Sequence, residues 1–374
     1  MRSVSVSRSR VLGYRFAAQQ LDRSASAVSE LAVLDIGVQD SGADAARLAF
    51  DGRLGSTPPT GGIGPGEPLA LVWSLRGAPH VHRRGDLDRF ASALYPLSEA
   101  DAAGRLNETG PSIARAGITA MEQYAIAVRA MKAVVRAPMG KGAASAAVTQ
   151  RIPEVMWRDC RPCQARHISD SAMRPAALAA GLEFEPGTSP PVLVPRLRPR
   201  VPTSVDVAAL QRLVLAYLTL LGPAAQADVA GYVDARRADI AAIWPDALVE
   251  VRVEGRSGWL PADRVDAMRD AEVPESVRLL GAFDPWLQAR DRWLIAPEES
   301  VHKLLWPVLG RPGVVLVNGE ILGVWRPKAS GRKLALNVSA FAPLPPHVWT
   351  AIEAEAERVA DVRCAASVVV KRVE

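Results

Sequence analysis

Residues 205–223, VDVAALQRLVLAYLTLLGP, carry the clearest structural signal in the sequence. Apolar residues recur at helical spacing from Val207 to Leu221, and Gly222-Pro223 is a typical helix stop. Two shorter helical patterns follow at 225–233 and 234–244, the second with Asp234 as a candidate N-cap. Residues 248–253 and 257–261 then read as two strands around a turn at Gly255. Three helices followed by a β-hairpin is the element order of a winged helix.

In a winged helix the third helix enters a DNA groove and the hairpin forms the wing. Arg236 and Arg237 lie at the start of the predicted third helix, where base or phosphate contacts are made. A winged helix can instead serve only as a scaffold or a dimer interface, because a fold does not fix a function. Both interpretations stay open at this point.

Length and composition predict a globular, cytoplasmic protein of two or three domains. The chain has 374 residues, of which 49% are hydrophobic. It contains no apolar run long enough to span a bilayer, and its basic start is not followed by the apolar core of a signal peptide. Three cysteines do not make a disulfide framework, which fits a reducing compartment.

The basic residues are mostly arginine, 39 of 45. Arginine binds phosphates in bidentate fashion, so the composition permits a nucleic-acid partner. A GC-rich genome that favours arginine codons explains the same bias.

Four segments follow one another along the chain. The first contains a Gly- and Pro-rich loop at 51–68, and the second is helical in pattern and ends in a Pro-rich linker at 186–202. The third is the winged-helix pattern described above. The fourth is β-rich, with a hairpin turn at Asn318-Gly319, a third strand at about 333–340, a helix over 346–362 and a short final strand.

The loop before that third strand is basic. A basic loop between strands can reach a phosphate backbone, although exposed loops are also basic for solubility. The candidate DNA-binding residues here are Arg326, Lys328, Arg332 and Lys333.

Several stretches together resemble the AlkZ-like family of DNA glycosylases. The resemblance is carried by FDPWLQARDRW (283–293), LWPVLGRPGVVLVNGEILGVWRPK (305–328), VWSLRGAPHVHRRGDL (72–87), RFAAQQL (15–21) and VLDIGVQDSGADAARLAF (33–50). It covers nearly the whole chain. It implies an α+β protein with tandem winged-helix domains and a C-terminal β-rich subdomain. The implied divisions are a first winged helix with the catalytic segment (1–110), a second with the linker (111–200), a third (201–270) and the β-rich subdomain (271–374).

The family's catalytic motif, Gln-x-Gln or Gln-x-Asp, would fall in GVQD, residues 37–40. The resemblance therefore makes Gln39 and Asp40 the candidate catalytic residues. The register that places Gln39 second puts Gly37 first, and the register that places Asp40 second puts Val38 first, so one polar partner is absent. A carboxylate can take a proton from water and an amide can hold that water in line. In the alternative interpretation, Asp40 or Ser41 caps the helix that follows.

Residues 156–182 hold Cys160, Cys163 and His167 at i, i+3 and i+7, which is one face of a helix if the helix is continuous. Thiolates and an imidazole suit zinc, but a structural zinc site uses four ligands. We favour the recognition-type helix of a second winged helix and no metal. Its DNA-facing residues would be Arg158, Arg161 and Arg166.

By resemblance, the strand APHVHRR, residues 78–84, lies near the DNA-facing edge of the first winged helix. His80 and His82 alternate onto one face of that strand. Arg76 and Arg84 lie beside the histidines, so these four residues complete the candidate DNA-binding set.

The sequence thus predicts a cofactor-independent protein that binds double-stranded DNA, with a monomer favoured and no membrane partner. The leading hypothesis is a monofunctional DNA glycosylase that acts on bulky alkylated purines. The alternative hypothesis is a non-catalytic winged-helix DNA-binding protein, either a regulator or a damage-recognition module.

Overall fold

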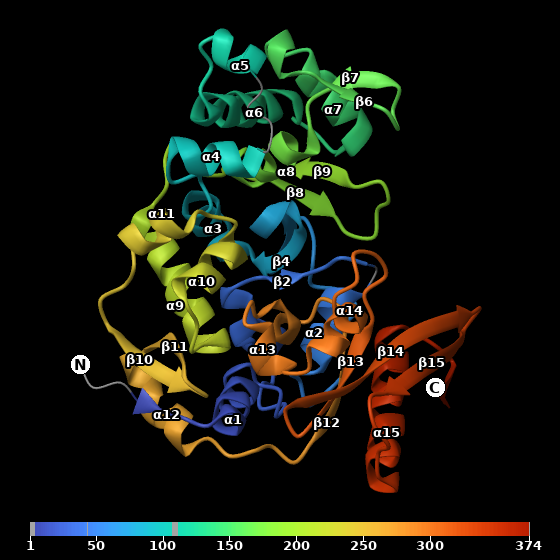
Figure 1. The fold of residues 1–374 in the computed structure, drawn as a ribbon. Helices are drawn as coiled ribbons and strands as arrows, with labels where there is room; N and C mark the ends of the chain where they lie inside the picture. Colours follow the sequence, from blue (N-terminus) through green and yellow to red (C-terminus); the bar gives the residue numbers. More distant parts are fainter. Residues whose placement is uncertain (1–3, 43, 107–110, 374) are drawn as a thin grey trace. The chain divides into compact units, whose positions relative to one another are not determined.

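The computed structural model describes residues 4–42, 44–106 and 111–373, which form the mixed α+β fold that the sequence predicts (Figure 1). The chain divides into two compact units, each assembled from separate segments. Unit 1 contains residues 1–61, 215–228 and 246–374, and unit 2 contains residues 62–214 and 229–245. In the described residues, no helix has the length and apolar character to cross a membrane.

Unit 1 combines helices with strands. Its helices are α1 (Arg8–Ala18), α2 (Ala45–Asp51), α12 (Val265–Asp270), α13 (Arg292–Ile295), α14 (His302–Leu305) and α15 (Pro346–Val362). Its strands are β1 (Val4–Ser5), β2 (Val38–Gln39), β10 (Leu248–Val253), β11 (Arg256–Pro261), β12 (Val277–Leu280), β13 (Gly313–Val317), β14 (Glu320–Ser330), β15 (Lys333–Ala340) and β16 (Ser367–Arg372). Two helices, α9 (Val207–Leu221) and α10 (Gln226–Val233), contribute residues to both units.

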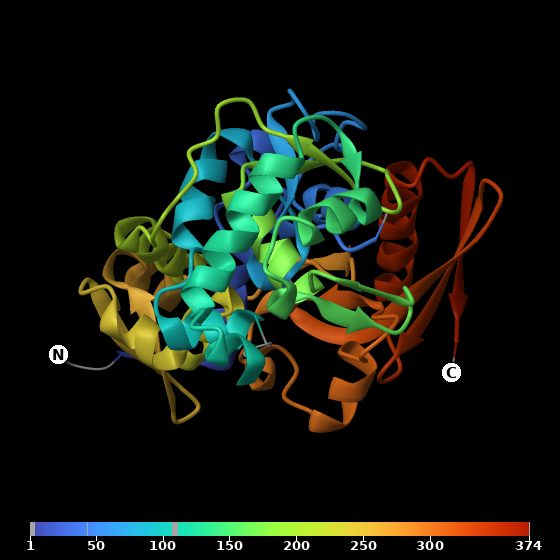
Figure 2. The ribbon, with the colours of Figure 1, turned by 90° about the horizontal axis from the view of Figure 1, so that it is seen from above.

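The main sheet of unit 1 has, among the described residues, five strands in the order β12-β13-β14-β15-β16. The predicted turn at Asn318-Gly319 joins β13 to β14, and both residues have the positive φ, 53° and 81°, that such a hairpin turn requires. Helix α15, red in Figure 2, packs along one face of this sheet. Trp325, Leu336 and Ile352 are buried in the core between the helix and the sheet.

The hairpin predicted from 248 to 261 is confirmed. Strands β10 and β11 pair antiparallel, and β1 joins the edge of β10 in parallel. Gly255 has a φ of 81° in the turn, as the sequence indicates. The predicted helix that ends at Gly222 is also confirmed as α9.

Unit 2 is built mainly from helices. They are α3 (Leu87–Ala93), α4 (Glu99–Leu106), α5 (Pro111–Arg115), α6 (Ala120–Val134), α7 (Lys141–Thr149), α8 (Asp170–Ala179) and α11 (Arg237–Ala242). Its strands are β3 (Leu69–Trp73), β4 (Pro79–Arg83), β5 (Met139–Gly140), β6 (Arg158–Cys160), β7 (Ala165–His167), β8 (Leu182–Glu185) and β9 (Val192–Pro195). Strands β3 and β4 form a hairpin, and β9 pairs with both β5 and β8.

Several local predictions are wrong. The helix expected over the cysteine segment is absent there, because residues 158–167 form the β6–β7 hairpin and only α8 is helical. The Pro-rich stretch is not wholly a linker, because β9 lies inside it. The basic loop is shorter than expected, since β14 continues to Ser330 and a two-residue turn leads into β15. Arg236, and not Asp234, occupies the N-cap position of α11.

Candidate functional site

Gln39 and Asp40 lie where a buried segment reaches the surface of unit 1. Ile36 and Val38 are fully buried, whereas Gln39 and Asp40 are only partly exposed. The apolar side chains anchor the segment in the core, so the two polar residues are held at its boundary. Gly37 has a φ of 78°, a conformation that favours glycine over other residues.

Asp40 caps helix α2 from six residues away. Its Oδ1 accepts a hydrogen bond of 2.9 Å from the backbone N–H of Ala46, in the first turn of α2. The first N–H groups of a helix have no partner within the helix, so this contact satisfies one of them. Asp44, the residue directly before the helix, makes no capping hydrogen bond. The capping interpretation is therefore confirmed for Asp40.

Ser41 has another role. Its Oγ accepts a hydrogen bond of 2.8 Å from Nε2 of Gln39. Gln39 is thereby oriented by the residue two positions along the chain, and Ser41 is a site residue that the sequence did not single out for this contact.

The charge of Asp40 is only weakly compensated. Burial raises the pKa of this carboxyl, the negative charge of Asp44 raises it further, and the hydrogen bond from Ala46 lowers it. Within the described residues, no cationic side chain forms an ion pair with Asp40, and Oδ2 receives no hydrogen bond. Asp40 therefore has one oxygen fixed by the backbone and a second oxygen available to another group.

Buried ion pairs fix the helix that Asp40 caps. Arg53, just after α2, donates to both carboxylate oxygens of Asp284 at 2.8 and 2.9 Å and to Oε1 of Gln19 at 3.0 Å. The side chains of Arg53 and Asp284 are both 0% exposed. Arg15 makes a similar buried pair with Asp291. Both aspartates belong to FDPWLQARDRW, so this conspicuous stretch has a structural role in unit 1.

A pocket of about 690 Å³ also lies in unit 1, between α1 and residues 264–274. Neither Gln39 nor Asp40 lines it. This pocket is therefore not formed by the candidate catalytic residues.

The predicted basic residues of the fourth segment lie on one face of the main sheet. Cross-strand pairing of β14 with β15 places Arg326 beside Asn337, Lys328 beside Ala335 and Ser330 beside Lys333, and pairing of β15 with β16 places Asn337 beside Lys371. Because side chains alternate along a strand, these residues point away from the face that α15 covers. We call this surface the basic face and define it by the exposed side chains of Arg326, Lys328, Lys333 and Lys371.

Lys371 was missed in the sequence. The alternation of SVVVKR in β16 contains the signal, because it sets Lys371 on the face opposite to the buried one. Arg332, which was predicted, lies in the turn between β14 and β15 and is exposed. The basic face carries no carboxylate among residues 326–330, 333–337 and 367–371.

Four predicted residues of unit 2 are engaged in its own packing. Arg84 donates to both carboxylate oxygens of Glu183, at 3.0 and 2.8 Å, and Arg76 donates to the carbonyl oxygen of Tyr232 at 2.6 Å. His80 and His82 are 1% and 0% exposed. Burial lowers the pKa of His82 to about 3 and lowers that of His80 well below its usual value, so both rings are neutral at neutral pH.

The burial of these rings opposes their predicted contact with DNA. His82 Nε2 lies 2.9 Å from Ser74 Oγ, and its ring packs 4.1 Å from that of Phe90. The alternation that placed both histidines on one face of the strand is correct, because their ring centroids lie 6.1 Å apart. Val81 on the other face is also 0% exposed, so both faces of β4 are buried at this point.

The remaining predicted arginines are more accessible. Arg236 and Arg237 are exposed at the start of α11, which is where the sequence placed them. In the β6–β7 hairpin, Arg161 and Arg166 are exposed, and Arg166 pairs with Glu154 at 2.8 Å. Arg158 is half-buried and donates to the carbonyl oxygens of Val155 and Trp157. These side chains come from two separate elements of unit 2, the β6–β7 hairpin and the start of α11.

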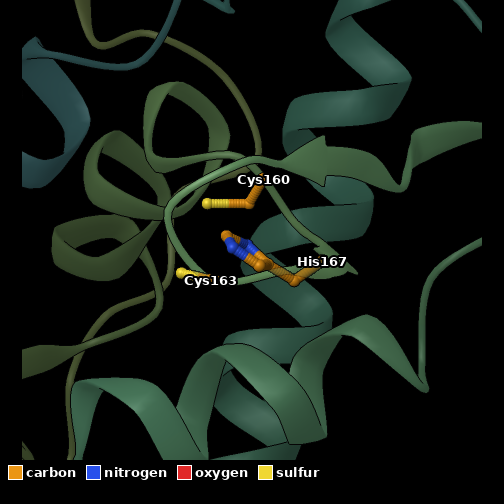
Figure 3. A group of neighbouring side chains, drawn as sticks. All are labelled: Cys160, Cys163 and His167. Carbon is orange, nitrogen blue, oxygen red and sulfur yellow. The ribbon is translucent and has the colours of Figure 1, made fainter.

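Cys160, Cys163 and His167 do come together, although not on a helix (Figure 3). Their potential ligand atoms all lie within 4.8 Å of one another. The β6–β7 hairpin brings them together. Cys160 lies on β6, Cys163 lies in the turn, and His167 lies on β7, which pairs antiparallel with β6. Hydrogen bonds from Cys163 and His167 lower the pKa of the Cys160 thiol.

Comparison with known proteins gives two matches. The family model described as DNA glycosylase AlkZ-like matches residues 65–362. Among solved structures, the DNA glycosylase AlkZ of Streptomyces sahachiroi matches with a TM-score of 0.74 and 19% sequence identity, over 99% of this chain and 100% of that one. No curated protein matches this sequence.

Proposed function

This chain belongs to the AlkZ-like DNA glycosylase family, and from that premise we propose that it hydrolyses the N-glycosidic bond of bulky alkylated purines in double-stranded DNA. The family supports base excision as the reaction, and the Streptomyces protein supports the fold. The lesion class and the catalytic residues are our proposal.

The proposed reaction is hydrolytic and needs no cofactor. An alkylated purine carries a positive charge, so it leaves with the bonding electron pair as a neutral base. The sugar passes through an oxocarbenium-like state, and water adds at the anomeric carbon. Asp40 stabilises the developing positive charge and accepts the proton that the water loses. Gln39 holds that water in line for attack.

One observation carries the assignment of Asp40. Its Oδ1 is fixed by the Ala46 N–H, whereas Oδ2 receives no hydrogen bond from the described residues. A general base needs a rigid carboxylate with an oxygen that a water molecule can reach.

We also propose how DNA is held. The basic face supplies phosphate contacts that are independent of sequence. Arg236 and Arg237 supply contacts at the start of a recognition helix, in a third winged helix that spans 201–270. Residues 1–110 and 111–200 are proposed as the first and second winged helices, and residues 271–374 as the β-rich subdomain. We further propose that the protein acts on DNA as a monomer in the cytoplasm, at the nucleoid if the host is a bacterium.

Single-turnover base release tests this function. The substrate is duplex DNA with a bulky cationic alkylpurine, and binding to the same duplex is recorded in parallel. We expect Asp40→Asn to lower the rate of release by about 10²- to 10⁴-fold, the usual contribution of a general base, with little change in affinity. The matched control is Glu357→Gln, an exposed carboxylate on α15 in the same unit. Equal release by wild type and Asp40→Asn would end the assignment.

A second function is favoured by one observation. The residue two positions before Gln39 is Gly37, whose positive φ disfavours the polar side chain that the family motif carries there. A protein that binds damaged DNA without excising the base would have no use for that side chain. Tight binding to the same duplex without any release by wild type would establish this alternative.

A further inference from the structure

The β6–β7 hairpin places three soft metal ligands around one point of unit 2. In the pairing register, Cys160 lies opposite Ala165 and His167 lies opposite Arg158. Residues opposite each other share a face, and so do residues two apart, so Cys160 and His167 share a face of the hairpin. Cys163 lies in the turn and points toward the same place (Figure 3).

The turn is held by its own hydrogen bonds. Gln164, directly after Cys163, has a φ of 51°, and its side-chain Nε2 donates to the carbonyl oxygen of Arg161 at 2.7 Å. These features fold the chain back between the two cysteines. The turn in the backbone therefore brings the two thiols close to each other.

His167 is oriented for metal binding. Its Nδ1 lies 2.6 Å from the carbonyl oxygen of Ile168, and a neutral ring in this position donates the Nδ1 proton to that oxygen. The lone pair of Nε2 is then left for a metal ion. A backbone carbonyl that fixes the tautomer in this way is the usual outer partner of a metal-binding histidine.

The base of the hairpin is anchored next to His167. The backbone N–H of Ile168 donates to Oγ1 of Thr149 in α7, at 2.9 Å. Ser169 caps α8 by accepting a hydrogen bond from Ala172 N–H. The backbone that follows His167 is therefore attached to two helices, while Cys160 is half-buried and Cys163 is exposed.

We propose that Cys160, Cys163 and His167 bind one Zn²⁺, or a similar thiophilic divalent ion, with the fourth position taken by water. Ligand atoms on a tetrahedral zinc ion lie about 3.5 Å apart, given bond lengths of about 2.0–2.3 Å. The three atoms here are within 4.8 Å of one another, so small side-chain rotations bring them to the metal.

The fourth position is assigned to water because the described cluster contains three protein ligands, and the neighbouring Asp170 is held by two cations. Oδ2 of Asp170 accepts hydrogen bonds from Lys141 Nζ at 2.8 Å and from Arg174 Nη2 at 2.7 Å. Within the described residues, the cluster contains no further Cys, His, Asp or Glu. Three protein ligands with an open position form a different arrangement from the closed four-ligand structural site.

The ion would give the hairpin a stability that its strands do not supply. Strands β6 and β7 have three residues each, and a two-stranded hairpin of this size is marginal in water. A bound ion links both cysteines to His167, whose following residues are anchored to α7 and α8. We therefore expect metal binding to order the segment that displays Arg161 and Arg166.

Metal content of the full-length protein tests the site. The reduced protein is loaded with Zn²⁺, freed of excess metal and analysed by elemental mass spectrometry. We expect one ion per chain in the wild type and loss of stoichiometric binding in Cys160→Ser, Cys163→Ser and His167→Gln. The matched control is Cys364→Ser, because Cys364 is exposed and lies in the other unit. One ion per chain in Cys160→Ser, or none in the wild type, would overturn the proposal.

Cobalt substitution gives a second readout that does not depend on any variant folding. Co²⁺ bound by two thiolates in a tetrahedral site shows intense thiolate-to-metal charge-transfer and visible d–d bands. We expect both in the wild type. Co²⁺ titration without a charge-transfer band, or isolation of the reduced and loaded protein with a Cys160–Cys163 disulfide in place of metal, would also contradict the site. Neither readout involves base release, so the result is independent of the proposed function.

Discussion

Carboxylates near the two ends of helix α2 differ in whether a cation pairs with them. Just beyond the C-terminal end, Arg53 contacts both oxygens of Asp284, and Arg358 pairs with Asp51 at 2.8 Å. At the N-terminal end, Asp40 has one backbone hydrogen bond and no described cationic partner. A carboxylate that stabilises the fold is paired with a cation. A carboxylate that keeps an oxygen without a partner is available for catalysis.

Removing the carboxylate at the C-terminal end has the largest expected effect. Asp284→Ala leaves the guanidinium of Arg53 buried without its partner, which costs about 3–5 kcal/mol of unfolding free energy. Urea denaturation measures this loss. The exposed control Glu357→Ala is expected to stay within about 0.5 kcal/mol of wild type. A similar small change in Asp284→Ala would show that the two ends of α2 do not differ as we describe.

The pH dependence of base release probes the N-terminal end. A general base must be ionised, and burial raises the pKa of Asp40 above its ordinary value. Below that raised pKa the carboxyl is protonated, so the rate is expected to fall about tenfold for each further pH unit. Single-turnover rates across the acid range measure this limb. A midpoint at or below the usual pKa of an aspartate would contradict the assignment.

Stability distinguishes the charge of Asp40 from its hydrogen bond. Asp40→Asn keeps an oxygen that accepts from the Ala46 N–H, whereas Asp40→Ala removes it, so the alanine variant is expected to be less stable by about 1 kcal/mol. The raised pKa means that the ionised form costs stability above the folded pKa, and this cost disappears as the pH falls through it. Asp40→Asn should therefore match or exceed the wild type in thermal unfolding at neutral pH. Equal stability of both variants would remove the capping role.

Cationic side chains also divide into paired and unpaired ones, and removing an unpaired one has the smallest expected effect of the four changes. Arg53 is committed to Asp284, whereas Lys371 is exposed on the basic face and makes no described ion pair. Lys371→Ala is expected to reduce the slope of log affinity for duplex DNA against log salt by about 0.9, the loss of one phosphate contact. Fluorescence anisotropy at several salt concentrations measures the slope. Lys303→Ala, an exposed lysine on α14, is the control, and an equal change in both variants would remove the basic face from the binding surface.

Local sequence patterns predicted the elements whose geometry is set by neighbours in the chain. The helix from Val207 to Leu221, the hairpin from 248 to 261 and the turn at Asn318-Gly319 follow from periodicity and turn chemistry. The helix predicted over the cysteine residues, 156–182, was wrong over 158–167. Spacings of three and seven residues fit one face of a helix, and they also fit a hairpin whose turn lies between the ligands. The three side chains lie together in the structure, although the helix that was expected to carry them is absent.

The candidate site could be predicted only in part from the sequence. The resemblance to a family selected Gln39 and Asp40, and no local rule would have done so. The hydrogen bond from Ala46 to Asp40 spans six residues, whereas common capping patterns span two or three. The division of the chain into two discontinuous units depends on packing between distant segments, which periodicity does not encode.

The large sequence separation of the buried ion pairs determines when the N-terminal segment can fold during translation. Arg53 meets Asp284 across 231 residues, and Arg15 meets Asp291 across 276. An emerging chain has both arginines long before either partner leaves the ribosome, and burying them alone would be costly. The segment that carries Asp40 therefore completes its fold only after most of the chain has been made. An incomplete translation product would contain Gln39 and Asp40 without the framework that fixes them.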